Sequence, residues 1–327
     1  MVRIEKNGNH GLLLPNLQIG LDSGKSDAQF TFISHAHADH VPSSRYLPVI
    51  ATPATAALMR VRGFKGEITE LDFRQPFETE RFKATFYPAG HILGSAMTYI
   101  ESELGTILYT GDYRTPPSPA SEGFEFPDKV DVFITEATFS LPVYRWKSHD
   151  EIFEQIRTFA LNTIQKDSVP VFVTYTLGKA QEVMMALAPL DIPMQLHDGA
   201  IGLSKVYEQF GFSIGKYSRI KPAEAKGSIL IVPMPYLSSQ EMQSISDKRI
   251  AYCSGWAELA NKQVLSGVDA LISLSDHLDF FELIRLCKRM NPKHVIITHT
   301  PNPDVVGHYL QQAGIQSSTK LPVEIRL

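Results

Sequence analysis

The sequence predicts an α/β protein, and three observations support this class. Short apolar runs rich in β-branched and aromatic residues recur along the chain, and segments with helical spacing lie between them. Polar residues able to do chemistry follow several of these runs directly. With 327 residues, 43% of them hydrophobic, the chain can bury the core of one large domain or two moderate ones.

The predicted strands have apolar centres of about 4–8 residues, bounded by polar or glycine-containing turns. They lie at residues 30–34, 82–91, 106–112, 130–139, 169–175, 228–235, 249–255, 269–277 and 294–300. Several helices are expected between them. Residues 53–63 begin with proline, which suits a first helical turn, and close on glycine. Residues 150–165 carry acids in the first turn and apolar residues at helical spacing, and 178–190 and 279–290 resemble them. This alternation is typical of an α/β chain.

Composition restricts the location and the partners. No apolar run approaches the roughly 20 residues of a membrane-spanning helix, and the first residues lack the apolar centre of a signal peptide. Cys253 and Cys287 lie in apolar segments and are expected to be reduced and packed. A cytoplasmic protein without membrane contact is therefore expected. The net charge of −4 counts against a large non-specific nucleic-acid surface, although bound divalent cations would add positive charge locally.

The segment "FISHAHADHV" at residues 32–41 is the first candidate metal site. In an extended chain, side chains two residues apart point the same way, so His35 and His37 can reach one metal ion. Once the chain turns, Asp39 and His40 can reach a second position nearby. Imidazole suits zinc-like ions, and carboxylate suits zinc or the harder manganese. The alternative is a solvated polar loop.

Later strand ends supply the groups that a metal site would still need. His91, Asp112 and His299 each follow a predicted strand, as do Glu136 and His277. Functional groups at strand ends are what an open α/β site requires. The structural alternatives are a buried strand histidine for His299, a helix cap for His277 and an exposed acid for Glu136. The other histidines default to surface or hydrogen-bonded core positions: His10, His149, His197, His294 and His308.

HxHxDH followed by these later residues resembles the metallo-β-lactamase fold. The resemblance implies a four-layer αββα sandwich. It also implies that one metal ion is bound by His35, His37 and His91, that a second is bound by Asp39, His40 and His299, and that Asp112 bridges them. Asp22 in "GLDSG" looks like the early acidic residue of the fold, which supports the metal loop from behind.

The sequence is further similar to the β-CASP nuclease branch, with Glu136, His277 and His299 as its additional motifs. That branch carries an inserted α/β domain, expected here at residues 144–266, between metallo-β-lactamase segments 1–143 and 267–327. "TEATFSLPVYR", "YTLGKAQEV" and "CSGW" look most like bacterial DNA ligase-associated exonucleases. Thr300 stands where the branch usually has glycine, so the turn behind His299 could differ.

The expected activity is two-metal hydrolysis of a DNA phosphodiester, by a single-strand-preferring exonuclease that acts in repair with a ligase and a helicase. Two zinc or manganese ions would activate water, with Asp112 between them. His277 would protonate the leaving oxygen, and Glu136 would orient His277. The alternatives are an RNA-processing nuclease of the same branch, a small-molecule hydrolase and a scaffold without activity.

Contacts to the nucleic acid are expected from four side chains. Lys179 lies at a glycine-containing helix start that could hold a phosphate, although such a turn is more often structural. Ser95, Arg114 and Arg145 are further candidates near the site motifs.

Overall fold

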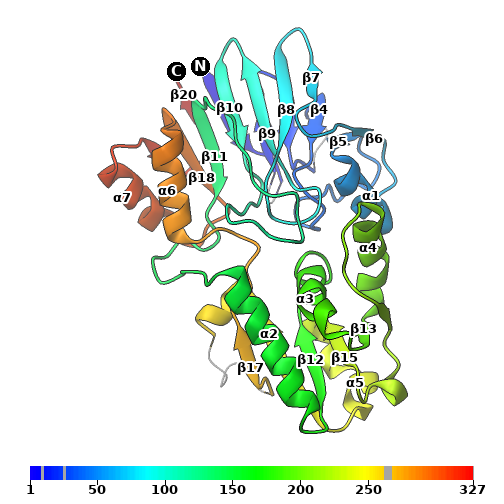
Figure 1. Ribbon diagram of the computed structural model, residues 1–327. Helices are drawn as coiled ribbons and strands as arrows, with labels where there is room; N and C mark the ends of the chain where they lie inside the picture. The colour runs from blue at the N-terminus through cyan, green and yellow to red at the C-terminus, as the bar shows by residue number, and fades with distance from the viewer. Residues whose placement is uncertain (9–10, 25–26, 261–266, 327) are drawn as a thin grey trace. The chain divides into compact units, whose positions relative to one another are not determined.

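The computed structural model describes residues 1–8, 11–24, 27–260 and 267–326. The chain forms two compact units (Figure 1). The first comprises Met1–Pro117, Ser121–Arg145 and His277–Leu327, and the second comprises Ser118–Ala120 and Trp146–Asp276. The division places residues 267–276 with the second unit, whereas the sequence prediction ended the inserted domain at residue 266. The physical reason is that β17 (Ala270–Ile272) pairs in parallel with β16 (Lys248–Cys253) of the second unit.

The first unit contains two sheets, each of seven strands among the described residues. The first sheet has the order β20-β1-β2-β3-β4-β5-β6, with strands Val323–Ile325, Val2–Lys6, Leu12–Leu14, Ile19–Leu21, Phe30–Phe32, Val49–Ala51 and Ile68–Glu70. The second has the order β19-β18-β11-β10-β9-β8-β7, with strands Ser317–Ser318, His294–Thr298, Val132–Glu136, Gly105–Tyr109, Ala96–Ser102, Phe82–Pro88 and Pro76–Glu78. Because β1 pairs with β20, the two ends of the chain lie side by side (Figure 1).

Two apolar clusters hold the first unit together. One joins the two sheets, with Phe32 of the first against Phe86 of the second. The other lies between the second sheet and α6 (Phe280–Met290), where Phe280 and Leu283 pack with Phe133 of β11. Helix α7 (Pro303–Gln312) lies beside α6 and β18, and α1 (Pro53–Val61) packs beside β6. The expected α/β class, with facing sheets and outer helices, is confirmed.

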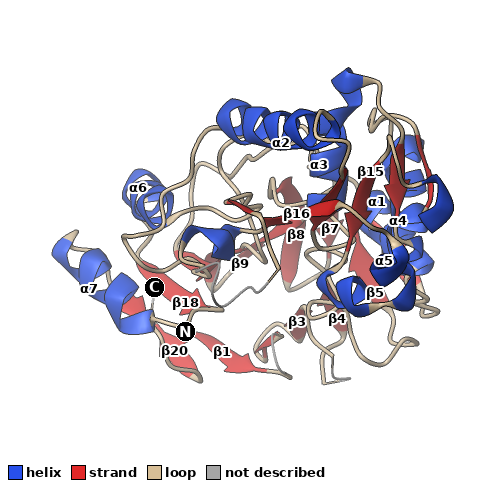
Figure 2. Ribbon diagram, turned by 90° about the horizontal axis from the view of Figure 1, so that it is seen from below, coloured by secondary structure: helices blue, strands red, loops and turns tan. Residues whose placement is uncertain are grey.

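The second unit is built on a parallel sheet with the order β14-β13-β15-β12-β16-β17. Strand β12 (Val169–Val173) is buried throughout, as expected for a strand covered on both faces. The remaining strands are β13 (Met194–Leu196), β14 (Tyr217–Arg219) and β15 (Ile229–Val232). The helices are α2 (His149–Ile164), α3 (Lys179–Leu187), α4 (Asp198–Gln209) and α5 (Gln240–Ser244), and Figure 2 shows them as coils beside the strands.

Asp131 joins three neighbouring strands of the second sheet. Its carboxylate accepts hydrogen bonds from the backbone N–H and the hydroxyl of Thr106, both at 2.9 Å, and contacts Lys293 Nζ at 3.0 Å. Burial raises the pKa of Asp131, but these hydrogen bonds and the ammonium group outweigh burial and hold the pKa below its usual range. Asp131 is therefore a carboxylate that contributes to stability in its ionised form.

The predicted helices match α1, α2, α3 and α6, and each predicted strand overlaps an observed one. Among the elements that the prediction did not include are α4, α5 and α7 and the strands β5, β6, β7, β9, β13 and β14. Both cysteines are buried and unpaired by disulfide, as expected. Within the described part of the chain, no helix has the length and apolar character needed to cross a bilayer.

Candidate metal centre

The loop after β4 turns back on itself at His37. The backbone N–H groups of His40 and Val41 donate to the carbonyl oxygen of His37 at 3.1 and 3.2 Å. This turn buries His35 and His40 fully and leaves His37 half-buried. The side chain of Asp39 is 55% exposed.

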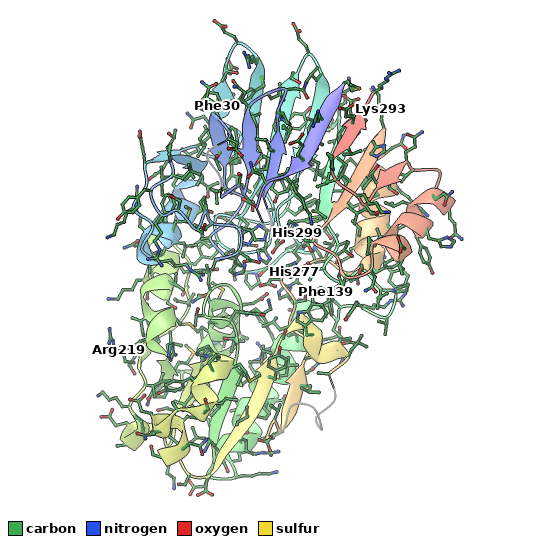
Figure 3. All side chains as sticks on the ribbon, turned by 180° about the vertical axis from the view of Figure 1, so that it is seen from behind. Phe30, Phe139, Arg219, His277, Lys293 and His299 are labelled. Carbon is green, nitrogen blue, oxygen red and sulfur yellow. The ribbon has the colours of Figure 1, made fainter. Side chains whose placement is uncertain are left out.

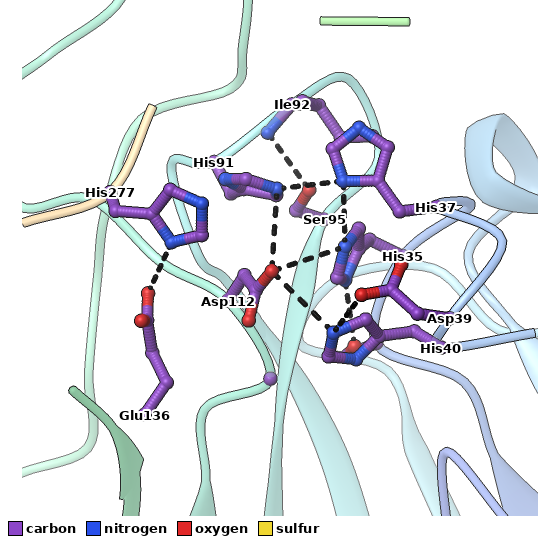
Figure 4. Close-up of polar contacts among 12 residues, drawn as sticks. His35, His37, Asp39, His40, His91, Ile92, Ser95, Asp112, Glu136 and His277 are labelled. Atoms are coloured by element: carbon purple, nitrogen blue, oxygen red, sulfur yellow. Dashed lines mark hydrogen bonds and ion pairs between the residues drawn. The ribbon is translucent and has the colours of Figure 1, made fainter. Parts of the chain in front are cut away.

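Four ligand atoms converge in the first part of the centre. One nitrogen each from His35, His37 and His91 and one oxygen of Asp112 all lie within 4.8 Å of one another (Figure 4). His37 Nδ1 is 3.1 Å from the Nε2 atoms of both His35 and His91. Asp112 Oδ2 is 3.7 Å from His35 Nε2 and 3.8 Å from His91 Nε2. Three imidazoles and one carboxylate form a donor set that suits a divalent metal ion of the zinc type.

Asp112 also faces the second pair. Its Oδ2 atom lies 3.5 Å from His40 Nε2, which is itself 3.8 Å from Asp39 Oδ2. The ring of His299 lies with its centroid 5.4 Å from that of His40. One carboxylate oxygen is thus shared by both halves of the cluster.

His299 follows β18 with a φ of 44°, in the left-handed region that a non-glycine residue seldom adopts. Thr300 is hydrogen-bonded in the turn, where its Oγ1 accepts from the backbone N–H of Asn302 at 3.2 Å. The left-handed conformation therefore falls on His299 itself, and Thr300 is accommodated in the following turn.

Asp22 lies behind the centre, and its hydrogen bonds determine which nitrogen of His35 and of His40 faces the centre. Its Oδ2 atom accepts from His40 Nδ1 at 2.8 Å, Ser34 Oγ at 2.6 Å and Tyr109 OH at 2.9 Å. Since the hydroxyl of Ser34 donates to Asp22, its oxygen accepts from His35 Nδ1 at 2.9 Å. Both imidazoles therefore carry a hydrogen on Nδ1, and Nε2 is the nitrogen that faces Asp112.

Gly111 makes this packing possible. Its φ is 56°, and a Cβ atom there would lie 2.4 Å from both the Cβ and the Oγ of Ser34. Only glycine allows the turn that carries Asp112 to approach the loop of His35 this closely.

Burial and the charges of the protein groups together keep His35 neutral and Asp112 ionised, and they favour a protonated His40. Burial, together with the neighbouring His40 and His91, lowers the pKa of His35, so its imidazole is neutral at neutral pH. Burial would raise the pKa of Asp112, but His40 outweighs it and the pKa of Asp112 is well below its usual range. Burial lowers the pKa of His40, but Asp112 and Asp22 raise it well above its usual value. An ionised carboxylate at the middle of the histidines is the partner a cation needs.

Glu136 and His277 form a second group beside the centre. Glu136 ends β11 and is 1% exposed, and its Oε1 lies 2.7 Å from His277 Nδ1. The ring of His277 is centred 4.7 Å from the ring of His91 (Figure 4). His277 lies three residues before α6, whose start is capped by Asp279, and Leu278 N–H donates to the carbonyl oxygen of Tyr113 at 3.1 Å. These contacts tie the loop of His277 to the loop of Asp112.

Of the four residues expected to contact nucleic acid, three are buried and one is exposed. Lys179 is 4% exposed and forms an ion pair with Asp276 inside the second unit. Arg114 is 4% exposed, and Ser95 is 1% exposed with its Oγ accepting from Ile92 N–H at 2.9 Å. These three side chains are therefore buried in the structure. Arg145 is exposed, and its guanidinium lies 4.5 Å from the centre of the Phe281 ring.

The remaining histidines have ordinary surroundings, apart from His10, which lies outside the described residues. Each contacts a polar group, and the pairs are His149 with Glu182, His197 with Gly199 N–H, His294 with Ser318 and His308 with Gln312. Sequence reasoning missed Ser34 and Tyr109, which donate hydrogen bonds to Asp22, and Thr138, whose backbone N–H and hydroxyl donate to Glu136. A serine directly before the first histidine and a threonine two residues after an acid were the available signals.

Comparisons with known proteins agree with this geometry. Residues 263–317, which include His277 and His299, match the family described as Zn-dependent metallo-hydrolase RNA specificity domain. A probable DNA ligase of Opitutus terrae is 35% identical over 297 residues, which cover 89% of this chain and 28% of the relative. An RNase J-like protein of Methanocaldococcus jannaschii is 28% identical over 210 residues, covering 54% of this chain and 49% of the relative.

These matches support a metallo-β-lactamase/β-CASP nuclease family for the chain. It spans about half or less of the length of these curated relatives. Another relative in the family is the cleavage and polyadenylation specificity factor subunit 3 of Dictyostelium discoideum, 36% identical over 128 residues, with 37% of this chain and 16% of the relative covered. A crystal structure of a protein of unknown function from Enterococcus faecalis matches with a TM-score of 0.63 at 15% identity, covering 92% of this chain and 81% of that one. That match supports the fold alone.

The donor set of the centre fits the divalent metal ion that the family implies. Ligand type, convergence of the ligand atoms and the support from Asp22 all agree with a metal site.

Proposed function

We propose that this protein is a nuclease that uses two divalent metal ions, zinc or manganese, to hydrolyse phosphodiester bonds in DNA. The Glu136–His277 pair beside the histidine and aspartate cluster carries the proposal. A metal cluster alone would also serve a hydrolase of small molecules. A histidine held by a buried carboxylate next to such a cluster adds a proton donor for a leaving alkoxide.

Each residue has a defined part. His35, His37 and His91 would hold one ion, Asp39, His40 and His299 would hold the other, and Asp112 would contact both. When bound, such ions supply Lewis acidity that activates water and offsets the charge of the phosphate. Asp22 holds the lone pairs of His35 and His40 toward the ions.

His277 would protonate the leaving oxygen. Its Nδ1 hydrogen is donated to Glu136, so proton transfer takes place at Nε2. Figure 4 shows the ring edge opposite Glu136 turned toward His91. Glu136 fixes the orientation of the ring, and its charge stabilises the protonated imidazole.

We further propose single-stranded DNA as the substrate, cleavage from an end, a cytoplasmic setting, and repair in company with a ligase and a helicase. The relative named a probable DNA ligase supports the DNA assignment. The second candidate is RNA processing, which is supported by the relatives named RNase J-like protein and endoribonuclease and by the RNA specificity domain match.

One experiment separates these candidates. Matched single- and double-stranded DNA and RNA oligonucleotides, labelled at either end, are incubated with the protein loaded with Zn²⁺ or Mn²⁺, with and without EDTA. We expect EDTA-sensitive shortening of single-stranded DNA. Cleavage of RNA alone would select the second candidate, and cleavage of neither would refute the proposal.

His277→Ala then tests the proton donor. We expect a loss of about 10²–10⁴-fold in turnover, the usual contribution of a general acid, with metal content unchanged. His308→Ala, at a histidine hydrogen-bonded to Gln312 on α7, is the matched control. A fall in metal content in His277→Ala would make His277 a ligand instead.

A further inference from the structure

The carboxylate of Glu136 is held at both oxygen atoms. Oε1 accepts from His277 Nδ1 at 2.7 Å and from Tyr113 N–H at 3.3 Å. Oε2 accepts from the backbone N–H of Thr138 at 3.0 Å and from its hydroxyl at 2.5 Å. Thr138 therefore donates to Oε2 through both its backbone N–H and its hydroxyl.

These two donors remove a freedom that a glutamate side chain otherwise has. The terminal torsion of glutamate is broad and roughly two-fold, so an unrestrained carboxylate can rotate and exchange its oxygens. Two hydrogen bonds from one residue to Oε2 fix the plane of the carboxylate and leave Oε1 facing His277. A carboxylate that already accepts from Thr138 also remains an acceptor toward the imidazole, so His277 keeps its hydrogen on Nδ1.

Thr138 also lies between two residues that contact His277. Strand β11 ends at Glu136, and Ala137 N–H still donates to the carbonyl oxygen of Thr298 at 3.1 Å. The ring of Phe139 then packs edge-on against His277, with centroids 5.8 Å apart (Figure 3). The hydrogen bonds of Thr138 to Glu136 close this short turn. They thereby set both the carboxylate and the aromatic ring that hold the imidazole.

We infer that Thr138 is a positioning residue for proton transfer by His277, acting through Glu136. The inference rests on the proposed phosphodiesterase function. It assigns to the Thr138 hydroxyl the task of keeping Nε2 of His277 in the orientation and protonation form that the leaving oxygen requires.

The test compares Thr138→Val, which keeps the shape and removes the hydroxyl, with Thr138→Ser, which keeps the hydroxyl. Thr158→Val is the matched control, because the exposed Thr158 hydroxyl also donates to a glutamate, Glu154, at 3.2 Å. On an oligonucleotide we expect Thr138→Val to lose about 10- to 100-fold in kcat, as for one hydrogen bond to a charged group, with KM and metal content unchanged. Thr138→Ser and Thr158→Val should stay within about threefold of the original protein.

A second substrate distinguishes positioning from general damage. Bis(p-nitrophenyl) phosphate releases a weakly basic phenolate that needs little protonation, so we expect Thr138→Val to hydrolyse it within about threefold of the original rate. Equal losses on both substrates, or no loss on the oligonucleotide, would overturn the inference.

An NMR measurement keeps the inference testable without turnover. In protein labelled with ¹⁵N-histidine, the hydrogen-bonded Nδ1–H signal of His277, assigned by its loss in His277→Gln, should persist in Thr138→Ser and vanish or broaden in Thr138→Val. An unchanged signal in Thr138→Val would refute positioning by Thr138. Failure of the original protein to cut any nucleic acid would instead refute the proposed function, and the NMR result would still stand on its own.

Discussion

Replacing Lys179 by methionine should destabilise the second unit strongly. Lys179 Nζ and Asp276 Oδ1 form an ion pair, and the two side chains are 6% and 3% exposed. Removing one partner of such a pair leaves a buried charge uncompensated, which costs about 3–5 kcal/mol. At about 1.4 kcal/mol per factor of ten, the unfolding equilibrium constant should rise by about 10²–10⁴-fold.

Tryptophan fluorescence during a urea titration gives the measurement. The chain has 2 tryptophans, and both Trp146 and Trp256 belong to the second unit, so their emission reports unfolding of that unit. Lys226→Met is the matched control. Its ammonium pairs with Asp167 at 2.6 Å, but the side chains are 71% and 77% exposed, and such a pair is worth less than about 1 kcal/mol.

The double variant Lys179→Met/Asp276→Leu separates the charge effect from a packing effect. With both charges removed, most of the stability should return, to within about 1–2 kcal/mol of the original protein. The reasoning is refuted if Lys179→Met costs no more than Lys226→Met. If Lys179→Met folds normally but binds oligonucleotides more weakly, the lysine contacts phosphate after all, as its position at a helix start suggested.

Three further outcomes are expected. Gly111→Ala should lower the amount of bound metal, and it should lower the free energy of unfolding by more than about 2 kcal/mol, because the new Cβ would overlap Ser34. Gly314→Ala is the control, since Gly314 also has a positive φ but a Cβ there would meet open space, and it should lower the free energy of unfolding by only about 1 kcal/mol. Equal losses in the two variants, with bound metal measured by mass spectrometry and stability by urea titration, would contradict this prediction. Asp112→Asn should abolish both metal binding and activity, and retained activity would exclude the two-metal proposal. Because the pKa of Asp131 is lowered in the folded state, its carboxylate adds to the free energy of unfolding above about pH 4, and this contribution is lost as the pH falls through the folded-state pKa. In urea titrations at a series of pH values, the free energy of unfolding of Asp131→Asn should therefore fall less steeply on acidification than that of the original protein.

The fold class and the candidate ligands could be predicted because they depend on patterns among neighbouring residues in the sequence. A strand with a polar residue at its end is visible in the sequence, so His91, Asp112 and His299 could be expected to face one edge. The two-residue spacing of His35 and His37 predicted a common direction for their side chains, and a turn of the chain was expected before Asp39 and His40. Each of these depends on a few neighbouring residues.

What could not be predicted depends on contacts between distant residues. A lysine after a glycine at a helix start looks like a phosphate contact, and only the fold shows Asp276, 97 positions later, beside Lys179. Arg114 and Ser95 are polar in the sequence, and nothing local shows that they are buried. The end of the second unit at Asp276, rather than at residue 266, depends on a distant contact in the same way, because β17 looks like any short strand until its pairing with β16 is known.

The parallel pairing of β11 with β18 has a consequence for how the chain folds as it is synthesised. Thr135 and Thr298 are hydrogen-bonded neighbours although 163 positions separate them. During synthesis from the N-terminus, the strand that ends in Glu136 therefore leaves one edge of its sheet unpaired until the whole second unit has been made. His277 and His299 follow the second unit in the sequence, so we expect the chain to gain its proton donor and its last expected metal ligand only after that unit has been made. Nascent chains that do not yet include His277 and His299 should therefore be inactive.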